Sequence, residues 1–229
     1  MTNRARLLPT RVPDRPGGVV LVLHGGASRQ DQMAVSPTQL SVLRMIPIAA
    51  RIAHAGQGRL AVFRLLNSTR GWDASHTPVD DVAWALGQLH DRFPDCADGL
   101  PTCLVGHSLG GRAALLAAGQ EDVRSVVALA PWVYPADGAL SLPPGRRLLV
   151  VHGDQDRVAS PERSELVARQ LRRSAEVGYV RVAGGSHAML RHGSVFDRAA
   201  ADFATATLLG DAPGPPVSQV LDGQELVEV

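Results

Sequence analysis

The chain has 229 residues, of which 45% are hydrophobic and 20% charged, and its formal net charge is +1 at pH 7. This length suits one α/β domain with a sizeable core, and the balanced charge without a basic tract argues against nucleic acid or an anionic membrane as the main partner. All 23 basic residues are arginine, so a mechanism that depends on a lysine amine is excluded.

The N-terminal segment, MTNRARLLPTRVPDRPGG, lacks the continuous apolar stretch of a secretory signal, and no run approaches membrane-spanning length. Two cysteines, Cys96 and Cys103, are too few for a disulfide framework. The apolar surroundings of Cys103 predict a buried side chain. We therefore expect a cytoplasmic protein.

Six short runs of aliphatic and β-branched residues predict strands. Their apolar residues are continuous rather than alternating, which is typical of parallel strands covered by helices on both faces. With their bounding turn residues, the runs span 18–26, 59–66, 102–108, 124–131, 146–154 and 177–185.

Three helices between these runs have clear start signals. Ser36-Pro37, Thr77-Pro78 and Ser160-Pro161 each place a hydroxyl where it can cap free amides and a proline at the first helical position. Gly56 and Gly119 stand where helices are expected to end. Strands that alternate with helices predict an α/β fold with a doubly wound, mostly parallel sheet.

The composition changes near residue 210. We expect one domain over residues 1–210 and a C-terminal tail over 211–229, which opens rich in proline and glycine and ends acidic and apolar. The sequence leaves two states of the tail open: it is either disordered or docked as an edge element.

The stretch GHSLG, residues 106–110, lies between a predicted strand and an Ala/Leu-rich helix and fits the pattern G-x-S-x-G. Such a sharp turn strains the backbone of the central serine, and only glycine avoids a collision on either side. The Ser108 hydroxyl then projects above the carboxyl edge of the sheet, where ligands bind in such folds. The pattern predicts a nucleophile at Ser108, with a tight turn that does no chemistry as the alternative.

A serine nucleophile needs a base, and the chain offers eight histidines. His187 follows the last apolar run, where Gly184 and Gly185 let the chain turn back over the sheet edge. We predict His187 as the base and keep His192, in the same region, as its rival. The other six lie in helices, within tight loop motifs or at element ends, and suit the role less well.

The acid that orients the base is expected after the preceding strand, in LLVVHGDQDRV. Asp154 follows Gly153 and is placed to cap the turn, as aspartate often does. Asp156 lies further into the loop, where it can reach an imidazole. We therefore predict Asp156 as the acid, which gives the chain order Ser108, Asp156, His187.

Four segments in this order resemble the motifs of the α/β-hydrolase superfamily, over about residues 19–209: LVLHGGAS (oxyanion loop), GHSLGG (nucleophile elbow), HGDQDRV (acid loop) and GGSHAML (histidine loop). The resemblance implies a serine hydrolase that cleaves carboxylic esters through an acyl-enzyme intermediate. It also implies an oxyanion hole built from the amides of Leu109 and of Gly26, or Ala27 in place of Gly26. Alternatives are a thioesterase, peptidase or acyltransferase with the same triad, and a non-catalytic small-molecule binder on this scaffold.

Two short segments depart from the family pattern. The connection from Pro131 to Arg146 leaves no room for a lid domain. The N-terminal portion is also short, so we expect the antiparallel strands that open the family's sheet to be reduced or absent. These departures imply an open, shallow site suited to a soluble ester or a small acyl group.

Aromatic and flexible apolar residues fall in the loops near the predicted site. Trp72, Trp132, Tyr134 and Met189 either line an acyl pocket or cover the edge of the core. No spacing of cysteine and histidine fits a metal site, and no glycine-rich loop fits a nucleotide. We expect no metal and no cofactor, a small-molecule acyl substrate, and a monomer or small homo-oligomer.

Overall fold

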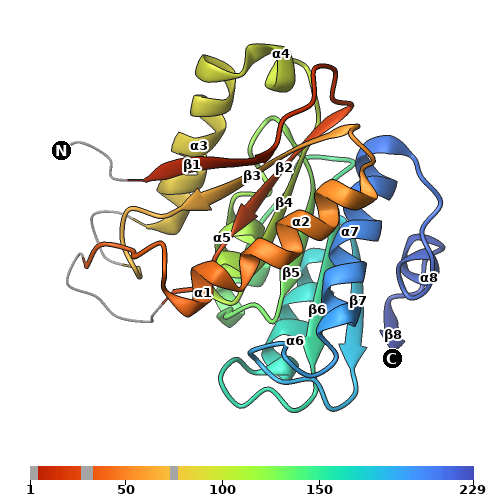
Figure 1. Ribbon diagram of the computed structural model, residues 1–229. Coiled ribbons are helices and arrows are strands. Elements are labelled where there is room, and N and C mark those ends of the chain that lie inside the picture. Colours follow the sequence, from red (N-terminus) through yellow and green to blue (C-terminus); the bar gives the residue numbers. More distant parts are fainter. Residues whose placement is uncertain (1–4, 27–32, 73–76) are drawn as a thin grey trace.

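The computed structural model describes residues 5–26, 33–72 and 77–229. Within them an eight-stranded sheet runs through the molecule in the order β1-β3-β2-β4-β5-β6-β7-β8 (Figure 1). Neighbouring strands are parallel except for the pair β1 and β3. The strands are β1 (Arg6–Arg11), β2 (Gly18–Leu23), β3 (Leu60–Leu66), β4 (Thr102–His107), β5 (Val123–Leu129), β6 (Arg147–Gly153), β7 (Glu176–Val182) and β8 (Leu226–Glu228). The predicted doubly wound, mostly parallel sheet is confirmed.

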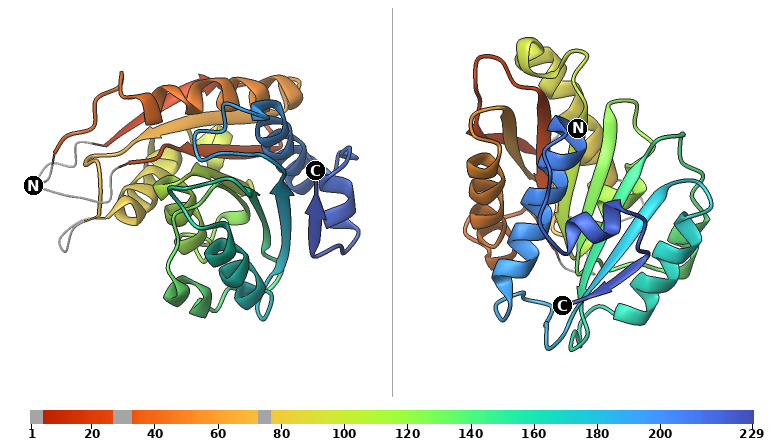
Figure 2. Two further views of the ribbon diagram at one scale, coloured as in Figure 1. Left: turned by 90° about the horizontal axis from the view of Figure 1, so that it is seen from below. Right: turned by 90° about the vertical axis from the view of Figure 1, so that its right-hand side faces the viewer.

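Helices cover both faces of this sheet (Figure 2). The helices are α1 (Leu40–Leu43), α2 (Met45–Ala55), α3 (Pro78–Arg92), α4 (Pro94–Ala97), α5 (Leu109–Leu116), the 3₁₀ helix η1 (Pro135–Ala139), α6 (Pro161–Leu171), α7 (Gly193–Leu209) and α8 (Val217–Leu221). Helices α3, α5 and α6 pack on one face, and α2 and α7 on the other. None of the helices in the described ranges is long and apolar enough to cross a membrane.

Strand β2 illustrates why the apolar runs are continuous. Val19, Leu21 and Leu23 contribute to the core under α3 and α5, while Val20 and Val22 contribute to the core under α2 and α7. Since alternate side chains of a strand point to opposite faces, both sets must be apolar when both faces are covered.

All six predicted strands are present, and two further strands escaped the sequence pattern. Strand β1 buries only Leu7 and contains Pro9 at an irregular register, so it has no apolar run. It pairs antiparallel with β3, which agrees with a reduced set of opening antiparallel strands. Strand β8 has three residues, of which only Val227 is buried.

Two of the three predicted helix starts are confirmed. The Asp80 carboxylate accepts hydrogen bonds from the backbone N–H and hydroxyl of Thr77, and Ser160 Oγ accepts the N–H of Arg163 at 3.1 Å. The start at Ser36 is wrong, because its hydroxyl accepts the N–H of Thr38 in a turn and α1 begins only at Leu40.

The two predicted helix ends had different outcomes. Gly56 does end α2. Gly119 does not end α5, which stops at Leu116, so Gly119 lies exposed beyond the helix.

The C-terminal tail packs against the edge of the sheet (Figure 2). Val217 of α8 has no exposed surface, and β8 pairs in parallel with β7, with Val227 opposite Val180.

The connection between β5 and β6, residues 130–146, contains only the 3₁₀ helix η1. The expected absence of a lid domain from this connection is confirmed.

Candidate active site

Ser108 occupies the turn between β4 and α5. Its backbone has φ 56° and ψ −118°, a conformation that residues with a side chain seldom adopt. A Cβ at Gly106 would lie 2.2 Å from the carbonyl oxygen of Gly110, and a Cβ at Gly110 would lie 2.5 Å from that of His24. Both glycines are therefore required by close backbone approach, as the sequence predicted.

The loops after β4, β6 and β7 bring Ser108, Asp156 and His187 into one hydrogen-bonded line. Ser108 Oγ lies 2.9 Å from His187 Nε2, and His187 Nδ1 lies 2.8 Å from Asp156 Oδ2. The side chain of Asp156 is fully buried, whereas that of His187 is 17% exposed. The imidazole can therefore meet a ligand while the carboxylate is shielded from solvent.

The Asp156 carboxylate accepts four hydrogen bonds. Oδ2 accepts from His187 and from His152 Nε2 at 3.0 Å, and Oδ1 accepts the backbone N–H groups of Val158 and Ala159 at 2.8 and 2.9 Å. Burial by itself raises the pKa of this carboxyl, but the hydrogen bonds from His152, His187 and the two amides outweigh it and hold the pKa well below its usual value. Asp156 is consequently a carboxylate at neutral pH.

The rival residues lie elsewhere. His192 directly precedes α7 and is exposed, and it does not line the cavity over Ser108. Asp154 is exposed, and its Oδ1 accepts the N–H of Gly184 at 2.7 Å, so its carboxylate bonds to the turn after β7.

Two further buried histidines hold the loops of the site. His107 Nε2 donates to the carbonyl oxygen of His187 at 2.8 Å, and burial lowers the pKa of His107 to about 3, so its ring is neutral. His24 Nδ1 donates to the carbonyl oxygen of Gly25 at 2.6 Å, and its Nε2 accepts the N–H of Asn67 at 3.1 Å. Burial also lowers the pKa of His24. The hydrogen bond of His107 holds the histidine loop, and the two bonds of His24 join the loops that follow β2 and β3.

The predicted oxyanion residues border the same cavity. Leu109 is the first residue of α5, so its N–H is among the helical amides that have no partner within the helix. Gly26 lies so close to the carbonyl oxygen of Arg70 that a Cβ there would approach it to 2.1 Å. Ala27, the alternative to Gly26, lies outside the described residues.

A cavity of about 720 Å³ opens over Ser108 and His187. This is a typical size for a ligand pocket and larger than the shallow site expected from the missing lid. The segment around α1 and the histidine loop contribute walls to this cavity, which no sequence pattern marked as such. The lining residues are Gly25, Gly26, Leu40, Ser41, Leu43, Arg44, Trp72, His107, Ser108, Leu109, Arg112, Trp132, Tyr134, Val158, His187, Ala188 and Leu190.

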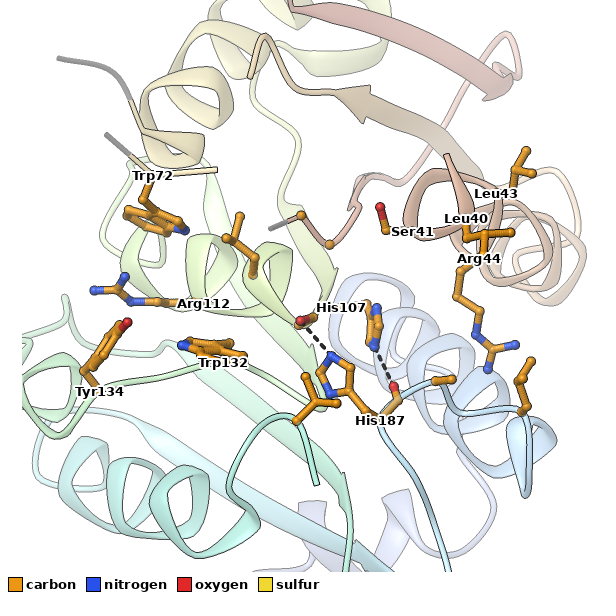
Figure 3. A pocket seen from close by; sticks show the side chains of 17 residues that line it. Leu40, Ser41, Leu43, Arg44, Trp72, His107, Arg112, Trp132, Tyr134 and His187 are labelled. Atoms are coloured by element: carbon orange, nitrogen blue, oxygen red, sulfur yellow. Dashed lines mark hydrogen bonds between the residues drawn. The ribbon is translucent and has the colours of Figure 1, made fainter. Parts of the chain in front are cut away.

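Three of the four predicted pocket residues line the cavity, and one does not. Trp72, Trp132 and Tyr134 line the cavity on one side of His187, opposite the side formed by Leu40 and its neighbours (Figure 3). Met189 does not line it. With φ 52°, its backbone turns the side chain into the core under α2 and α7, where it has no exposed surface.

Arg112 stacks against two residues of the aromatic wall, a contact that no sequence pattern indicated. Its guanidinium carbon lies 4.3 Å from the ring centre of Trp72 and 4.6 Å from that of Tyr134. Its Nε and Nη2 donate to the two carboxylate oxygens of buried Asp137 at 2.7 and 3.0 Å. The charge is thus paired, and the two rings are fixed by stacking on it.

No family model and no curated protein matches the sequence. Several solved structures are similar to it. Est1E from Butyrivibrio proteoclasticus, solved with ferulic acid bound, matches with a TM-score of 0.63 at 16% identity, covering 89% of this chain and 94% of that one. XC6422 from Xanthomonas campestris, an α/β serine hydrolase without a lid, matches with a TM-score of 0.63 at 20% identity over 91% and 90% of the two chains. An esterase from Pyrobaculum calidifontis matches with a TM-score of 0.67 at 17% identity over 90% and 84%.

At these identities the likeness is one of fold. The chain has the α/β-hydrolase fold without a lid domain, as its motifs predicted. A shared fold does not fix the reaction, which depends on the residues of the site.

Proposed function

We propose that this chain is a serine hydrolase that cleaves carboxylic esters through an acyl-enzyme intermediate. The observation that carries the proposal is the continuous line from Ser108 Oγ through the His187 ring to Asp156 Oδ2, with contacts of 2.9 and 2.8 Å. Tight turns and core packing do not require these three groups to meet in this order. The esterase names of the similar structures support the same reaction class.

In the first half of the reaction, His187 Nε2 takes the proton of Ser108 as Oγ attacks the ester carbonyl carbon. Asp156 keeps the proton of His187 on Nδ1 and stabilises the imidazolium that forms. The carbonyl oxygen becomes an oxyanion, which the amides of Leu109 and Gly26 are proposed to bind. Collapse of this intermediate expels the alcohol, which receives the proton from His187.

In the second half, water enters the site of the departed alcohol. His187 takes a proton from it, hydroxide attacks the acyl carbon, and a second oxyanion forms at the same amides. Collapse breaks the bond to Ser108 Oγ, which recovers its proton, and releases a carboxylic acid. Both halves of the reaction therefore use only the ester, water and residues of this chain.

The cavity favours esters with a sizeable apolar part. Its volume of about 720 Å³ exceeds what an acetyl ester fills, and its walls carry Trp72, Trp132 and Leu40. Apolar surface that a substrate buries there contributes roughly 25 cal/mol per Å². We therefore expect catalytic efficiency to rise from acetate toward medium-chain or aryl esters.

Replacement of Ser108 by alanine tests the proposal. We expect kcat/KM for p-nitrophenyl esters to fall by roughly 10³-fold or more, because members of a triad act as a unit. A fluorophosphonate probe is expected to label the native protein and not the variant. Ser194→Ala, an exposed serine of α7 outside the cavity, is the matched control and is expected to keep full activity and labelling.

Undiminished ester hydrolysis by Ser108→Ala would refute the nucleophile. A parallel assay with acyl esters, acyl thioesters and aminoacyl amides of the same acyl group separates the reaction classes that one triad can serve. We expect the esters to give the highest kcat/KM. A native protein that binds these compounds but neither turns them over nor reacts with the probe would be a binding protein instead.

A further inference from the structure

A second imidazole contacts the carboxylate oxygen that orients His187. His152, at the end of β6, places Nε2 at 3.0 Å from Asp156 Oδ2, the same atom that lies 2.8 Å from His187 Nδ1. A carboxylate oxygen only accepts, so both rings donate to it. The negative charge of Asp156 is therefore shared between two histidines.

The His152 ring is buried and held at both nitrogens. Its side chain has no exposed surface, and Nδ1 lies 2.7 Å from Ser164 Oγ. Ser164 Oγ also lies 2.9 Å from the carbonyl oxygen of Pro161 and 3.0 Å from the hydroxyl of Tyr179. A chain of hydrogen-bonded groups thus runs from Tyr179 in β7 through α6 to the candidate catalytic carboxylate.

The contact with the Asp156 carboxylate requires a proton on Nε2 of the His152 ring. Nε2–H donates to Asp156, Nδ1 contacts the Ser164 hydroxyl, and the Ser164 and Tyr179 hydroxyls lie 2.9 and 3.1 Å from the Pro161 carbonyl oxygen, to which they donate. Both nitrogens of the ring thus have a polar partner within hydrogen-bond distance. A side chain that merely filled this space would need neither nitrogen, and burying two polar atoms without partners would be costly.

We propose that His152 is a positioning residue that fixes Asp156 through Oδ2 and draws part of its charge away from His187. The inference rests on the proposed function, since it concerns the base of that same site. With less carboxylate charge directed at it, His187 holds its extra proton less tightly.

The titratable groups around both rings are few. His152 contacts Asp156 directly and Tyr179 only through Ser164, and Glu162 of α6 lies near enough for a coulombic effect. His187 faces Asp156, and the neutral ring of His107 lies 5.0 Å from it, centre to centre. Arg44, whose guanidinium donates to the carbonyl of Met189, acts on His107 only through space.

The decisive variant is His152→Met, which keeps apolar volume and removes the donor. We expect kcat to fall by roughly tenfold to a hundredfold, because a hydrogen bond to a charged group is lost. We also expect the acidic limb of the kcat/KM profile to move to higher pH, by several tenths to about one unit, because Asp156 then stabilises the His187 imidazolium more strongly. His152→Gln, whose side-chain amide restores a neutral donor, is expected to return the limb close to its native position.

Tyr179→Phe is the matched control, since it removes a hydroxyl from the same buried network without touching Asp156. It is expected to lower the unfolding midpoint and leave the acidic limb in place. If His152→Met lowers stability and leaves the limb unmoved, His152 is a packing residue and the proposal is overturned.

A ¹⁵N NMR measurement on the native protein tests the inference without variants or turnover. The ring signals of His152 are expected to report a proton on Nε2, and a bare Nε2 contradicts the proposal. An NMR titration of His187 in native protein and in His152→Met measures the same coupling in the absence of substrate. An active Ser108→Ala variant would refute the proposed function and still leave this titration as an independent answer for His152.

Discussion

The floor and the walls of the cavity are held in different ways. By the floor we mean Ser108 and His187 together with the buried Asp156 and His152 behind them. On the floor, Asp156 accepts four hydrogen bonds, and the rings of His152 and His187 are each bonded at both nitrogens. On the walls, Leu40 and Leu190 are 83% and 77% exposed and pack against little else. The floor is thus fixed by hydrogen bonds, whereas the walls present exposed apolar side chains.

This difference separates chemistry from selectivity. A floor with fixed donors stabilises developing charge without reorganisation, so changes there are expected to act on kcat. Apolar walls bind the ground state and the transition state about equally, so changes there are expected to act on KM. The wall of Trp72 and Tyr134 is intermediate, because it is apolar toward the cavity but fixed from behind by the Arg112–Asp137 pair.

The largest effect is expected on the floor, from Asp156→Asn. The amide keeps the shape of the carboxylate but cannot accept from all four donors, and it stabilises the wrong tautomer of His187. Loss of this function lowers kcat by roughly 10⁴-fold in serine hydrolases with such a triad. Stopped-flow or steady-state assays with a p-nitrophenyl ester measure it, with exposed Asp154→Asn as the control. Equal activities of the two variants would remove Asp156 from the mechanism.

A smaller effect is expected on the fixed wall, from Arg112→Met. Asp137, only 6% exposed, then keeps the N–H of Tyr134 as a partner but loses its paired cation. Breaking a buried pair in this way is expected to lower the free energy of unfolding by about 3 kcal/mol, measured by urea denaturation.

Arg147→Met, which breaks the exposed pair with Glu176, is the control and is expected to cost less than about 1 kcal/mol. Equal losses in the two variants would mean that the Arg112 pair is no more than a surface contact.

The sequence predicted the meeting of Ser108, Asp156 and His187 on the floor, because each of these three residues has a local signature. Ser108 is marked by two glycines between a strand and a helix. Asp156 and His187 each follow an apolar run at a glycine turn. Parallel strands end at one edge of the sheet, so residues that follow them meet there whatever their separation in sequence.

The walls were predicted poorly because their contacts depend on tertiary packing. Nothing local marks Leu40 or Arg112 as cavity residues, and Met189 is turned away by a single left-handed residue. His152, in the segment HGDQD, was predicted only as the end of a strand, because its contact with Asp156 depends on how the loop folds back.

The sequence also did not predict β1 and β8. These edge strands have one buried residue each and therefore no apolar pattern.

The smallest effect is expected at the mouth of the cavity, from Leu40→Ser combined with Leu190→Ser. Both side chains are mostly exposed, so the variant is expected to fold with native stability. A long acyl chain buries less apolar surface against serine than against leucine, so KM for p-nitrophenyl octanoate is expected to rise by about threefold to tenfold. Hydrolysis of the acetate, which is too short to reach the mouth, is expected to stay unchanged.

Val12→Ser, an exposed valine outside the cavity, is the control for this change and is expected to alter neither ester. A fall in kcat on both esters would mean that the mouth holds the floor in place, and the separation between the two regions would fail. An unchanged KM for the octanoate would mean that the acyl chain lies against the aromatic wall instead. Trp132→Ala would then be expected to raise that KM, because Trp132 is the wall residue that neither stacks on Arg112 nor is bonded to Asp137.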